Sequence, residues 1–325
     1  MKFTVPQTLQ SIAGILNARF HGNPGSPILG INEIHMVTPG DITFVDHPKY
    51  YDKALNSAAT TIIINKEVEC PEGKTLIFSD HPFDDYVALA RHFMPFQPAV
   101  AMISPTAEIG EGTVIQPGVF IGNYVKIGKG CIIHPHVSIY DRTVIGDNVI
   151  IQSNSVIGGD AYYFQRRPEG YKKLESCGRT VIEDDVEIGA LCAVDRGVSG
   201  DTVVGKGTKI DNHVQVGHDT TIGHHCLIGA HCAIAGVTRI EDDVILWARV
   251  SVNKDLVIGA KAVVFAMSGV DKSLEGGKKY WGVPAEDARK KWKELAYMRR
   301  LSEFFPTNET ATEMENGNGN GKEAY

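Results

Sequence analysis

Aliphatic residues recur at every sixth position through most of the chain. Isoleucine stands at each sixth position from 103 to 157, and the register resumes over 182–194 and again over 204–270. A helix of 3.6 residues per turn cannot place residues six apart on one face, whereas short strands joined by tight turns can. The repeat therefore predicts a solenoid. Three hexads per coil would form a triangular parallel β-helix of about eight coils, roughly 40 Å long at a strand spacing near 4.8 Å.

The fourth position after each aliphatic residue is also restricted, so each hexad points one large and one smaller side chain inward. Valine and threonine are common there, as at Val214 and Thr220. Four cysteines occupy this smaller inward position, and we expect them to serve packing: Cys131, Cys192, Cys226 and Cys232. Glycine often follows the aliphatic residue, which indicates a close backbone approach or unusual backbone angles.

Four regions follow from where the hexad register begins and ends. Residues 1–100 lack it and combine helical spacing at 6–17 and 83–94 with a β-rich run at 60–65, which predicts a small α/β domain. Residues 101–280 form the β-helix, and 281–305 a C-terminal helical segment. Residues 306–325 are polar and repetitive, and we expect them to be disordered.

Two insertions interrupt the solenoid. The first, 158–179, is aromatic and basic, and the second is the short segment around 195–197. Insertions in solenoids become loops, often on the binding face. We therefore expect both to wall a site.

Composition narrows the class of protein. The chain has 325 residues, 43% of them hydrophobic and 22% charged, which is typical of a globular protein with a core. A net charge of -7 argues against general nucleic-acid binding. The sequence has no apolar run long enough to span a bilayer and no signal-peptide pattern at its start, so we expect a cytoplasmic protein with no transmembrane segment. Residues 289–300 are locally basic, which indicates either a solvated helix face or a dock for an acidic partner.

Five histidines lie between 213 and 231, and none takes an inward position of the hexad. They are therefore expected on the outside of the solenoid, where a substrate or another subunit could meet them. His218 stands out because it ends the pattern AspAsnxxGlnxxHis at 211–218. Histidine has an unperturbed pKa near 6.5, so it exchanges protons readily at neutral pH.

The order of these features resembles the UDP-3-O-acylglucosamine N-acyltransferase family of lipid A biosynthesis. The resemblance covers about residues 1–305, including the aromatic segment 41–51, the segment VEIGALCAVDRG at 186–197 and the motif at 211–218. It implies a left-handed β-helix and a homotrimer with each site lined by two chains. It also implies transfer of a 3-hydroxyacyl chain from acyl carrier protein to the 2-amino group of the UDP-sugar.

The resemblance also implies roles for particular residues. His218 would be the general base, and the backbone N–H of Gly236 would contact the oxyanion. Asn212 and Gln215 would help place the acyl donor, and Asp211 would orient the site. Neither proton transfer nor thioester attack requires a metal or a cofactor, so none is expected. The basic segment 289–300 would receive acyl carrier protein.

Phe44 and Tyr50 match the aromatic residues that hold uracil in this family, and the chain departs from the family pattern nearby. His47 stands where asparagine usually contacts the base, and Asp255 stands where a second site histidine is expected. Gly269 lies near the expected end of the acyl groove. A residue without a side chain there would leave room for a longer acyl chain.

Three other functions are compatible with the sequence. The departures at His47 and Asp255, and an aspartate directly after His218 as in the sister enzyme that O-acylates UDP-N-acetylglucosamine, would fit an O-acyltransferase or a paralogue acting on another nucleotide sugar. His213 and His218 are five apart, as in metal-dependent hydratases on the same fold, although zinc needs a third protein ligand. A non-catalytic binding or scaffold role is the last alternative, because a fold does not determine a function.

Overall fold

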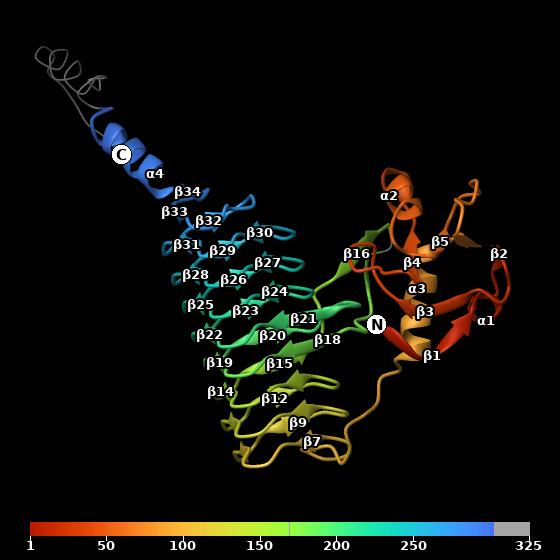
Figure 1. The fold of residues 1–325 in the computed structure, drawn as a ribbon, viewed down its shortest axis with the longest axis horizontal. Coiled ribbons are helices and arrows are strands. Elements are labelled where there is room, and N and C mark those ends of the chain that lie inside the picture. The colour runs from red at the N-terminus through yellow and green to blue at the C-terminus, as the bar shows by residue number, and fades with distance from the viewer. Residues whose placement is uncertain (169, 302–325) are drawn as a thin grey trace, which may run out of the picture.

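The structure is a computed structural model that describes residues 1–168 and 170–301. A three-sided solenoid runs through most of the chain, and a separate N-terminal domain lies beside its middle coils instead of stacking on its end (Figure 1). The C-terminal helix projects from the last coil. The tail expected over 306–325 falls outside the described residues.

The N-terminal domain contains a mixed six-stranded sheet in the order β1-β3-β4-β5-β6-β2. Its strands are β1 (Lys2–Thr8), β2 (Arg19–His21), β3 (Pro27–Ile31), β4 (Asp41–Val45), β5 (Thr61–Ile64) and β6 (Thr75–Phe78). Its helices are α1 (Leu9–Leu16), the 3-10 turn η1 (Pro48–Tyr50), α2 (Tyr51–Leu55) and α3 (Pro82–Phe93). The helix expected at 6–17 begins later because Thr8 caps it, accepting from the Ser11 N–H at 3.1 Å, while the residues before it form a strand that pairs with β3.

The solenoid has three faces of parallel strands, which confirms the predicted fold class, a left-handed parallel β-helix. The first face holds β7 (Glu108–Ile109), β10 (Lys126–Ile127), β13 (Val144–Ile145), β18 (Arg179–Ile182), β21 (Asp201–Val204), β24 (Thr221–Ile222), β27 (Arg239–Ile240) and β30 (Val257–Ile258). The second face holds β8 (Val114–Ile115), β11 (Ile132–Ile133), β14 (Ile150–Ile151), β19 (Glu187–Ile188), β22 (Lys209–Ile210), β25 (Leu227–Ile228), β28 (Ile245–Leu246), β31 (Val263–Val264), β33 (Lys279–Trp281) and the antiparallel β34 (Glu286–Asp287). The third face holds β9 (Phe120–Ile121), β12 (Ser138–Ile139), β15 (Val156–Gly159), β20 (Ala193–Asp195), β23 (Gln215–Val216), β26 (Ala233–Ile234), β29 (Ser251–Val252) and β32 (Gly269–Val270).

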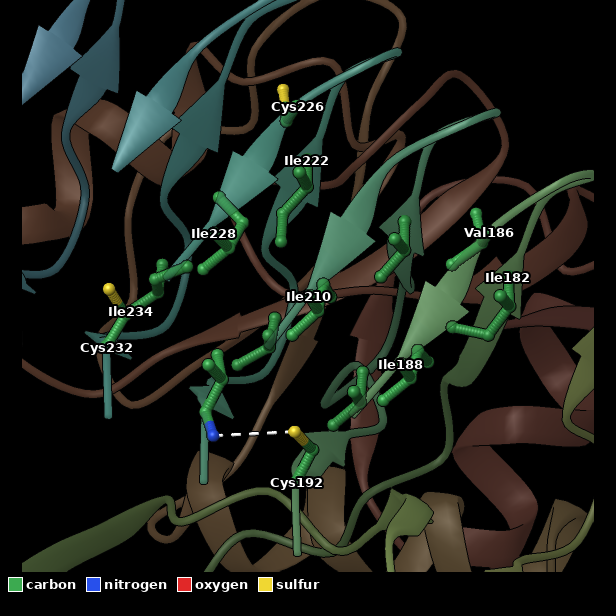
Figure 2. Close-up of a cluster of buried hydrophobic side chains, with 14 of the residues drawn as sticks. Ile182, Val186, Ile188, Cys192, Ile210, Ile222, Cys226, Ile228, Cys232 and Ile234 are labelled. Carbon is green, nitrogen blue, oxygen red and sulfur yellow. Dashed lines mark hydrogen bonds between the residues drawn. The ribbon is translucent and has the colours of Figure 1, made fainter. Parts of the chain in front are cut away.

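The inward side chains form rows along the solenoid, as the repeat predicts. Ile210, Ile228 and their equivalents are buried on neighbouring strands of the second face (Figure 2). The four inward cysteines are buried and carry free thiols. Ile103 and Ile109 remain about two-fifths exposed because they lie in the first coil, where no coil covers them from below.

The glycines that follow the aliphatic residue of each hexad lie at the corners of the solenoid, where neighbouring coils approach closely. Most glycines after the aliphatic residue do not have positive φ; instead a Cβ at Gly229 would lie 2.6 Å from the backbone N of Ala248 in the next coil. The left-handed conformation occurs two residues further on and is mostly taken by asparagine, aspartate, histidine and other non-glycine residues, such as Asp219 with φ 54° and His231 with φ 59°. The glycines therefore permit close coil stacking, and other residue types make the turn.

The first insertion ties the N-terminal domain to the solenoid. It forms a hairpin of β16 (Phe164–Arg167) and β17 (Gly170–Lys173). Arg167 forms an ion pair with Asp46 after β4 at 2.7 Å, and Lys172 pairs with Asp84 of α3 at 2.9 Å. The hairpin is thus held against two elements of the domain.

The C-terminal segment forms α4 (Ala288–Arg299), whose first turn is capped by the Asp287 carboxylate. Trp292 stacks on Phe265 of the solenoid with ring centroids 6.1 Å apart, which anchors the helix to the last coils. Within 1–168 and 170–301, no helix has both the length and the apolar character needed to cross a membrane.

Candidate active site

One corner of the solenoid carries most of the candidate residues. It comprises the turns between the third and first faces, at 217–220, 235–238 and 253–256, and we call it the site corner. Both insertions leave the solenoid at this same corner, in the two coils directly below the turn that carries His218. The arrangement agrees with the expectation that the insertions wall a site.

His218 and Asp219 form a hydrogen-bonded pair. His218 Nδ1 lies 2.9 Å from Asp219 Oδ2. A carboxylate only accepts hydrogen bonds, so Nδ1 carries the proton and Nε2 is left as the basic nitrogen. The His218 side chain is 13% exposed and is therefore largely buried, whereas the other four histidines expected on the outside are exposed.

The second insertion fixes the Asp219 carboxylate. The Val198 N–H donates to Oδ2 at 2.9 Å and the Gly200 N–H donates to Oδ1 at 3.3 Å, while the Asp219 N–H donates to Thr202 Oγ1 at 2.8 Å. Burial opposes ionisation of this side chain. The hydrogen bonds from His218 and Val198 outweigh it and hold the pKa of Asp219 below its usual value.

Gly236 lies directly above His218, one coil further along the chain. A Cβ at position 236 would lie 2.7 Å from His218 Nε2, so only glycine fits while the ring keeps its place. The basic nitrogen of His218 therefore faces the backbone of Gly236. Asp255 stands in the next coil of the same corner, and its N–H donates to the Gly236 carbonyl at 3.2 Å.

The N-terminal domain reaches this corner through the loop that follows β3. The Glu33 N–H donates to Ser199 Oγ at 2.9 Å, and His35 Nε2 lies 3.9 Å from Glu33 Oε2. Tyr163, from the first insertion, places its ring 5.8 Å from the His218 ring and shares a hydrogen bond with Glu33. Both domains therefore enclose His218.

The electrostatics of this enclosure are unusual. Burial, followed by the nearby Asp219 charge, raises the pKa of Glu33 to about 8. Burial also lowers the pKa of His35 and raises that of Tyr163. Burial likewise raises the pKa of Asp195, which accepts a hydrogen bond from Gln215 Nε2 at 2.9 Å.

The residues expected to hold a uracil base lie on the side of the domain that borders this corner. Phe44 is half-buried, with its ring 4.8 Å from Tyr86 of α3. Tyr50 is 47% exposed, and its ring lies 6.0 Å from that of His47, which is also exposed. Tyr50 is close enough to contribute to the raised pKa of Tyr163. The aromatic segment thus continues toward His218.

Two predicted residues lie away from the site corner. Asp211 and Asn212 are in the turn between the second and third faces, one corner before His218. Asn212 Oδ1 accepts from the Ala190 N–H at 2.7 Å and its Nδ2 donates to Asp211 at 3.0 Å. Within one chain they do not meet His218, whereas Gln215 lies on the third face between the two corners.

A groove on the third face leads away from Gln215. The outward residues Ala233, Ser251 and Gly269 follow Gln215 on successive strands, and all are small. The cavity that they line has a volume of about 580 Å³ and ends against Val283. From Gln215 to Gly269 the groove spans about 14 Å at the usual strand spacing.

One group of described residues has the composition of a metal site. Glu33, His35 and Asp219 each offer a ligand atom within 4.8 Å of the others. However, the Asp219 oxygens already accept three N–H donors, so this carboxylate is poorly placed to bind a cation. The pair His213 and His218 does not converge in one chain, because His213 stacks on His231 at the preceding corner with centroids 4.6 Å apart.

Sequence reasoning missed Glu33, His35 and Tyr163. No motif marks them, and their contacts with the solenoid join residues far apart in the chain. The only signals were the polar residues within the mainly apolar stretch 27–37 and the aromatic character of the insertion.

Comparison with known proteins assigns the family. Residues 26–92 match the family of UDP-3-O-(3-hydroxymyristoyl) glucosamine N-acyltransferase, and residues 124–159 and 201–236 match bacterial transferase hexapeptide repeats. A UDP-3-O-acylglucosamine N-acyltransferase from Wolinella succinogenes is 35% identical over 289 residues, which cover 82% of this chain and 90% of the relative. The chain belongs to the UDP-3-O-acylglucosamine N-acyltransferase family.

Other UDP-3-O-acylglucosamine N-acyltransferases match over shorter spans. The one from Syntrophotalea carbinolica is 38% identical over 64% of this chain and 68% of its own length. The one from Methylobacterium sp. (strain 4-46) is 36% identical over 47% of this chain, and the match spans only 43% of that relative.

Solved structures support the fold. A UDP-N-acetylglucosamine acyltransferase from Bacteroides fragilis superposes with a TM-score of 0.53 at 23% identity, covering 70% of this chain and 92% of that protein. One from Campylobacter jejuni gives a TM-score of 0.52 at 18% identity, covering 69% and 91%. At these identities the likeness concerns the fold alone.

The hydrogen bonds to Asp219 predict that its carboxylate stabilises the fold. Asp219→Asn replaces an acceptor of charged hydrogen bonds, so the free energy of unfolding at pH 7 should fall by about 1–3 kcal/mol. Because the folded-state pKa of Asp219 is lowered, its contribution is present above the unfolded pKa and is lost as the pH falls through the folded one. The difference between wild type and variant should therefore shrink below about pH 4, as measured by denaturant unfolding.

Asp243→Asn is the matched control, because Asp243 has the same left-handed backbone (φ 59°) but is exposed. It should leave stability within about 0.5 kcal/mol. An equal effect of both substitutions would contradict a special role for the buried carboxylate.

Proposed function

We propose that this protein transfers a 3-hydroxyacyl chain from acyl carrier protein to the 2-amino group of UDP-3-O-acylglucosamine. Family membership supports the reaction class. The observation that carries the assignment to this site is the His218–Asp219 pair, with Nε2 of His218 facing the backbone of Gly236 at the mouth of an apolar groove.

The chemistry follows from that geometry. The sugar amine attacks the thioester carbonyl, and His218 Nε2 accepts the amine proton as the C–N bond forms. The Gly236 N–H donates to the developing oxyanion. Collapse of the tetrahedral intermediate breaks the C–S bond, and the imidazolium returns the proton to the departing thiolate. Asp219 holds the ring and stabilises the imidazolium while it exists.

Substrate binding divides between the two domains in this proposal. Phe44 and Tyr50 would hold the uracil ring, with His47 contacting the base from the same segment. Gln215 would help place the acyl donor, and Asp255 would face the sugar or its phosphates. The reaction requires no metal or cofactor besides the acyl carrier protein substrate. A nucleotide sugar and an acyl carrier protein are both cytoplasmic substrates, which supports a cytoplasmic location for this protein.

The C-terminal helix is proposed to receive acyl carrier protein. Between Arg289 and Arg300 the chain carries six basic residues and one acidic residue. The helix begins shortly after Val283 and Pro284, which line the far end of the groove. A positive surface on an acidic protein favours an acidic partner at this position.

The activity is tested by mass-spectrometric transfer assays. Purified protein receives 3-hydroxyacyl carrier protein with UDP-3-O-acylglucosamine, and in parallel with UDP-N-acetylglucosamine. The amine should be acylated, and His218→Ala should reduce the rate by about 10²–10⁴-fold because the general base is lost. His224→Ala, an exposed histidine of the next turn, should not change it. Product from the acetylated sugar alone would instead support the O-acyl reaction.

We propose that the protein is a homotrimer whose sites lie between chains. Apolar residues hold most outward positions of the second face, including Val114 and Leu227, each 47% exposed. Exposed apolar columns of this kind are typical of surfaces that contact another protein. Asp211 and Asn212 line a cavity on this face that a second copy would cover, bringing Asn212 to the His218 of its neighbour.

Mixed trimers test this arrangement. Asn212→Asp keeps the acceptor for the Ala190 N–H but removes the amide donor. Trimers of this variant alone, or of His218→Ala alone, should be weakly active. Trimers assembled from both should regain activity, because some sites combine an intact Asn212 with an intact His218. Mixing His218→Ala with Asp219→Asn is the control without recovery, since both residues belong to one chain's corner. An active monomer by light scattering would refute the proposal.

The groove makes Gly269 a determinant of acyl length in this proposal. Its φ is not positive, and an added Cβ would lie 3.5 Å from Val283 Cγ1, an ordinary contact. Gly269→Val should therefore fold and shorten the groove. Transfer of the longest accepted chain should fall by about 10–200-fold in kcat/KM, with shorter chains affected less. Arg239→Val, at an outward position of the first face, is the control; an unchanged chain-length profile for Gly269→Val would contradict the role.

A further inference from the structure

Glu33 is a buried carboxyl group that the acyl-transfer chemistry leaves unused. The residue is 5% exposed, and Oε2 has no hydrogen-bond partner among the described residues. It lies on the loop after β3, where the N-terminal domain meets the second insertion. The same loop carries His35, so the domain places two polar side chains beside Asp219 of the His218–Asp219 pair.

The surroundings of Glu33 determine its charge. A carboxylate oxygen of Asp219 lies within 4.8 Å of one of Glu33, and Asp219 is already stabilised as an anion by His218 and two backbone N–H groups. Two buried carboxylates this close cannot both be charged without a compensating cation or proton.

The other groups facing Glu33 do not supply a cation. Burial lowers the pKa of His35, which favours its neutral form, and burial raises the pKa of Tyr163, whose hydroxyl meets the Glu33 carboxyl. Cys177 and Tyr86 also lie within electrostatic reach, and burial raises both of their pKa values. The Met1 ammonium donates to the Ile31 and Ser199 carbonyls and to Asn32 Oδ1. In the described part of the chain, neither this ammonium nor any lysine or arginine forms an ion pair with Glu33. A proton is therefore the remaining means of balance.

We propose that Glu33 is a positioning residue that works as a neutral carboxylic acid: contributed by the N-terminal domain, it closes the pocket behind His218 and leaves Asp219 as the single negative charge there. Its catalytic consequence rests on the proposed function. Ionised Glu33 would add a second negative charge, which would hold a proton on His218 and oppose docking of the domain. Because the pKa of Glu33 is raised to about 8, Glu33 ionises and acyl transfer declines at mildly alkaline pH.

The pH profile of acyl transfer tests the catalytic part. Wild-type kcat/KM should decline above about pH 8, approaching tenfold per pH unit. Glu33→Gln mimics the neutral acid, so it should match the wild type at pH 7 and lose this alkaline decline, while the acid limb stays unchanged. Glu72→Gln, an exposed glutamate of the same domain, should behave as the wild type. An alkaline decline that persists in Glu33→Gln would overturn the proposal.

Two measurements independent of activity separate this proposal from the proposed function. Infrared difference spectra at pH 6.5 should contain the carbonyl band of a protonated carboxylic acid in the wild type and lack it in Glu33→Gln. Because the folded-state pKa is raised, the wild type loses stability as the pH rises from about 4.5 to 8. The Tm of Glu33→Gln should therefore exceed that of the wild type by a margin that grows over this range, by a few degrees.

Three results would contradict or separate these proposals. A Tm difference that does not vary with pH, or the absence of the infrared band, would mean that Glu33 is ionised. A stoichiometric metal ion in the purified wild type that Glu33→Gln fails to retain would mean that a cation balances the carboxylates. If neither sugar is acylated while the band and the Tm trend are present, the protonated state holds and the proposed function fails.

Discussion

The stacking of inward aliphatic side chains from coil to coil is the constraint on which the rest of the molecule depends. Val216 pairs with Ile234, one coil of eighteen residues later, and the next coils repeat this spacing. Because the inside must stay in register, the outside is in register as well. Gly236 lies above His218 for this reason. Extra residues are accommodated only at corners, which is where both insertions leave the solenoid without disturbing the strand pairs on either side.

The regular stacking of coils also fixes the backbone conformation at the site corner. Each of the three turns of this corner has one left-handed residue, and in the His218 turn that residue is Asp219. The turn conformation buries its carboxylate beneath the second insertion. The backbone N–H groups of that insertion compensate the burial. A local backbone requirement of the fold therefore becomes the means by which the catalytic candidate His218 is oriented.

The sequence predicts the solenoid well because the relevant interactions repeat. An isoleucine such as Ile222 has the same neighbours as Ile240, so the pattern is visible many times over. The role of Glu33 is not predictable in this way. Its partners, Ser199, Tyr163 and Asp219, are distant in the chain and occur once, and a glutamate in a loop is normally solvated.

Local capping also limited the secondary-structure prediction. The apolar spacing at 6–17 indicates a helix, but Thr8 starts it late and the preceding residues pair with β3. The family resemblance implies that Asn212 helps place the acyl donor, but the motif alone contains no information on which corner each residue occupies. Only the count of strands between them separates the two positions.

The lateral docking of the N-terminal domain has a consequence for the order of folding. The domain is synthesised first, yet Ser199, Tyr163 and Arg167, which hold its inner surface, emerge from the ribosome 121 to 166 residues after the residues that they contact. Solenoid coils can form progressively from their first turn, since each needs only its neighbour. The domain therefore cannot dock until the middle coils exist, and its apolar core is completed only then by Leu174 and Val198 of the two insertions. Closing that long loop is the non-local step in an otherwise local folding process.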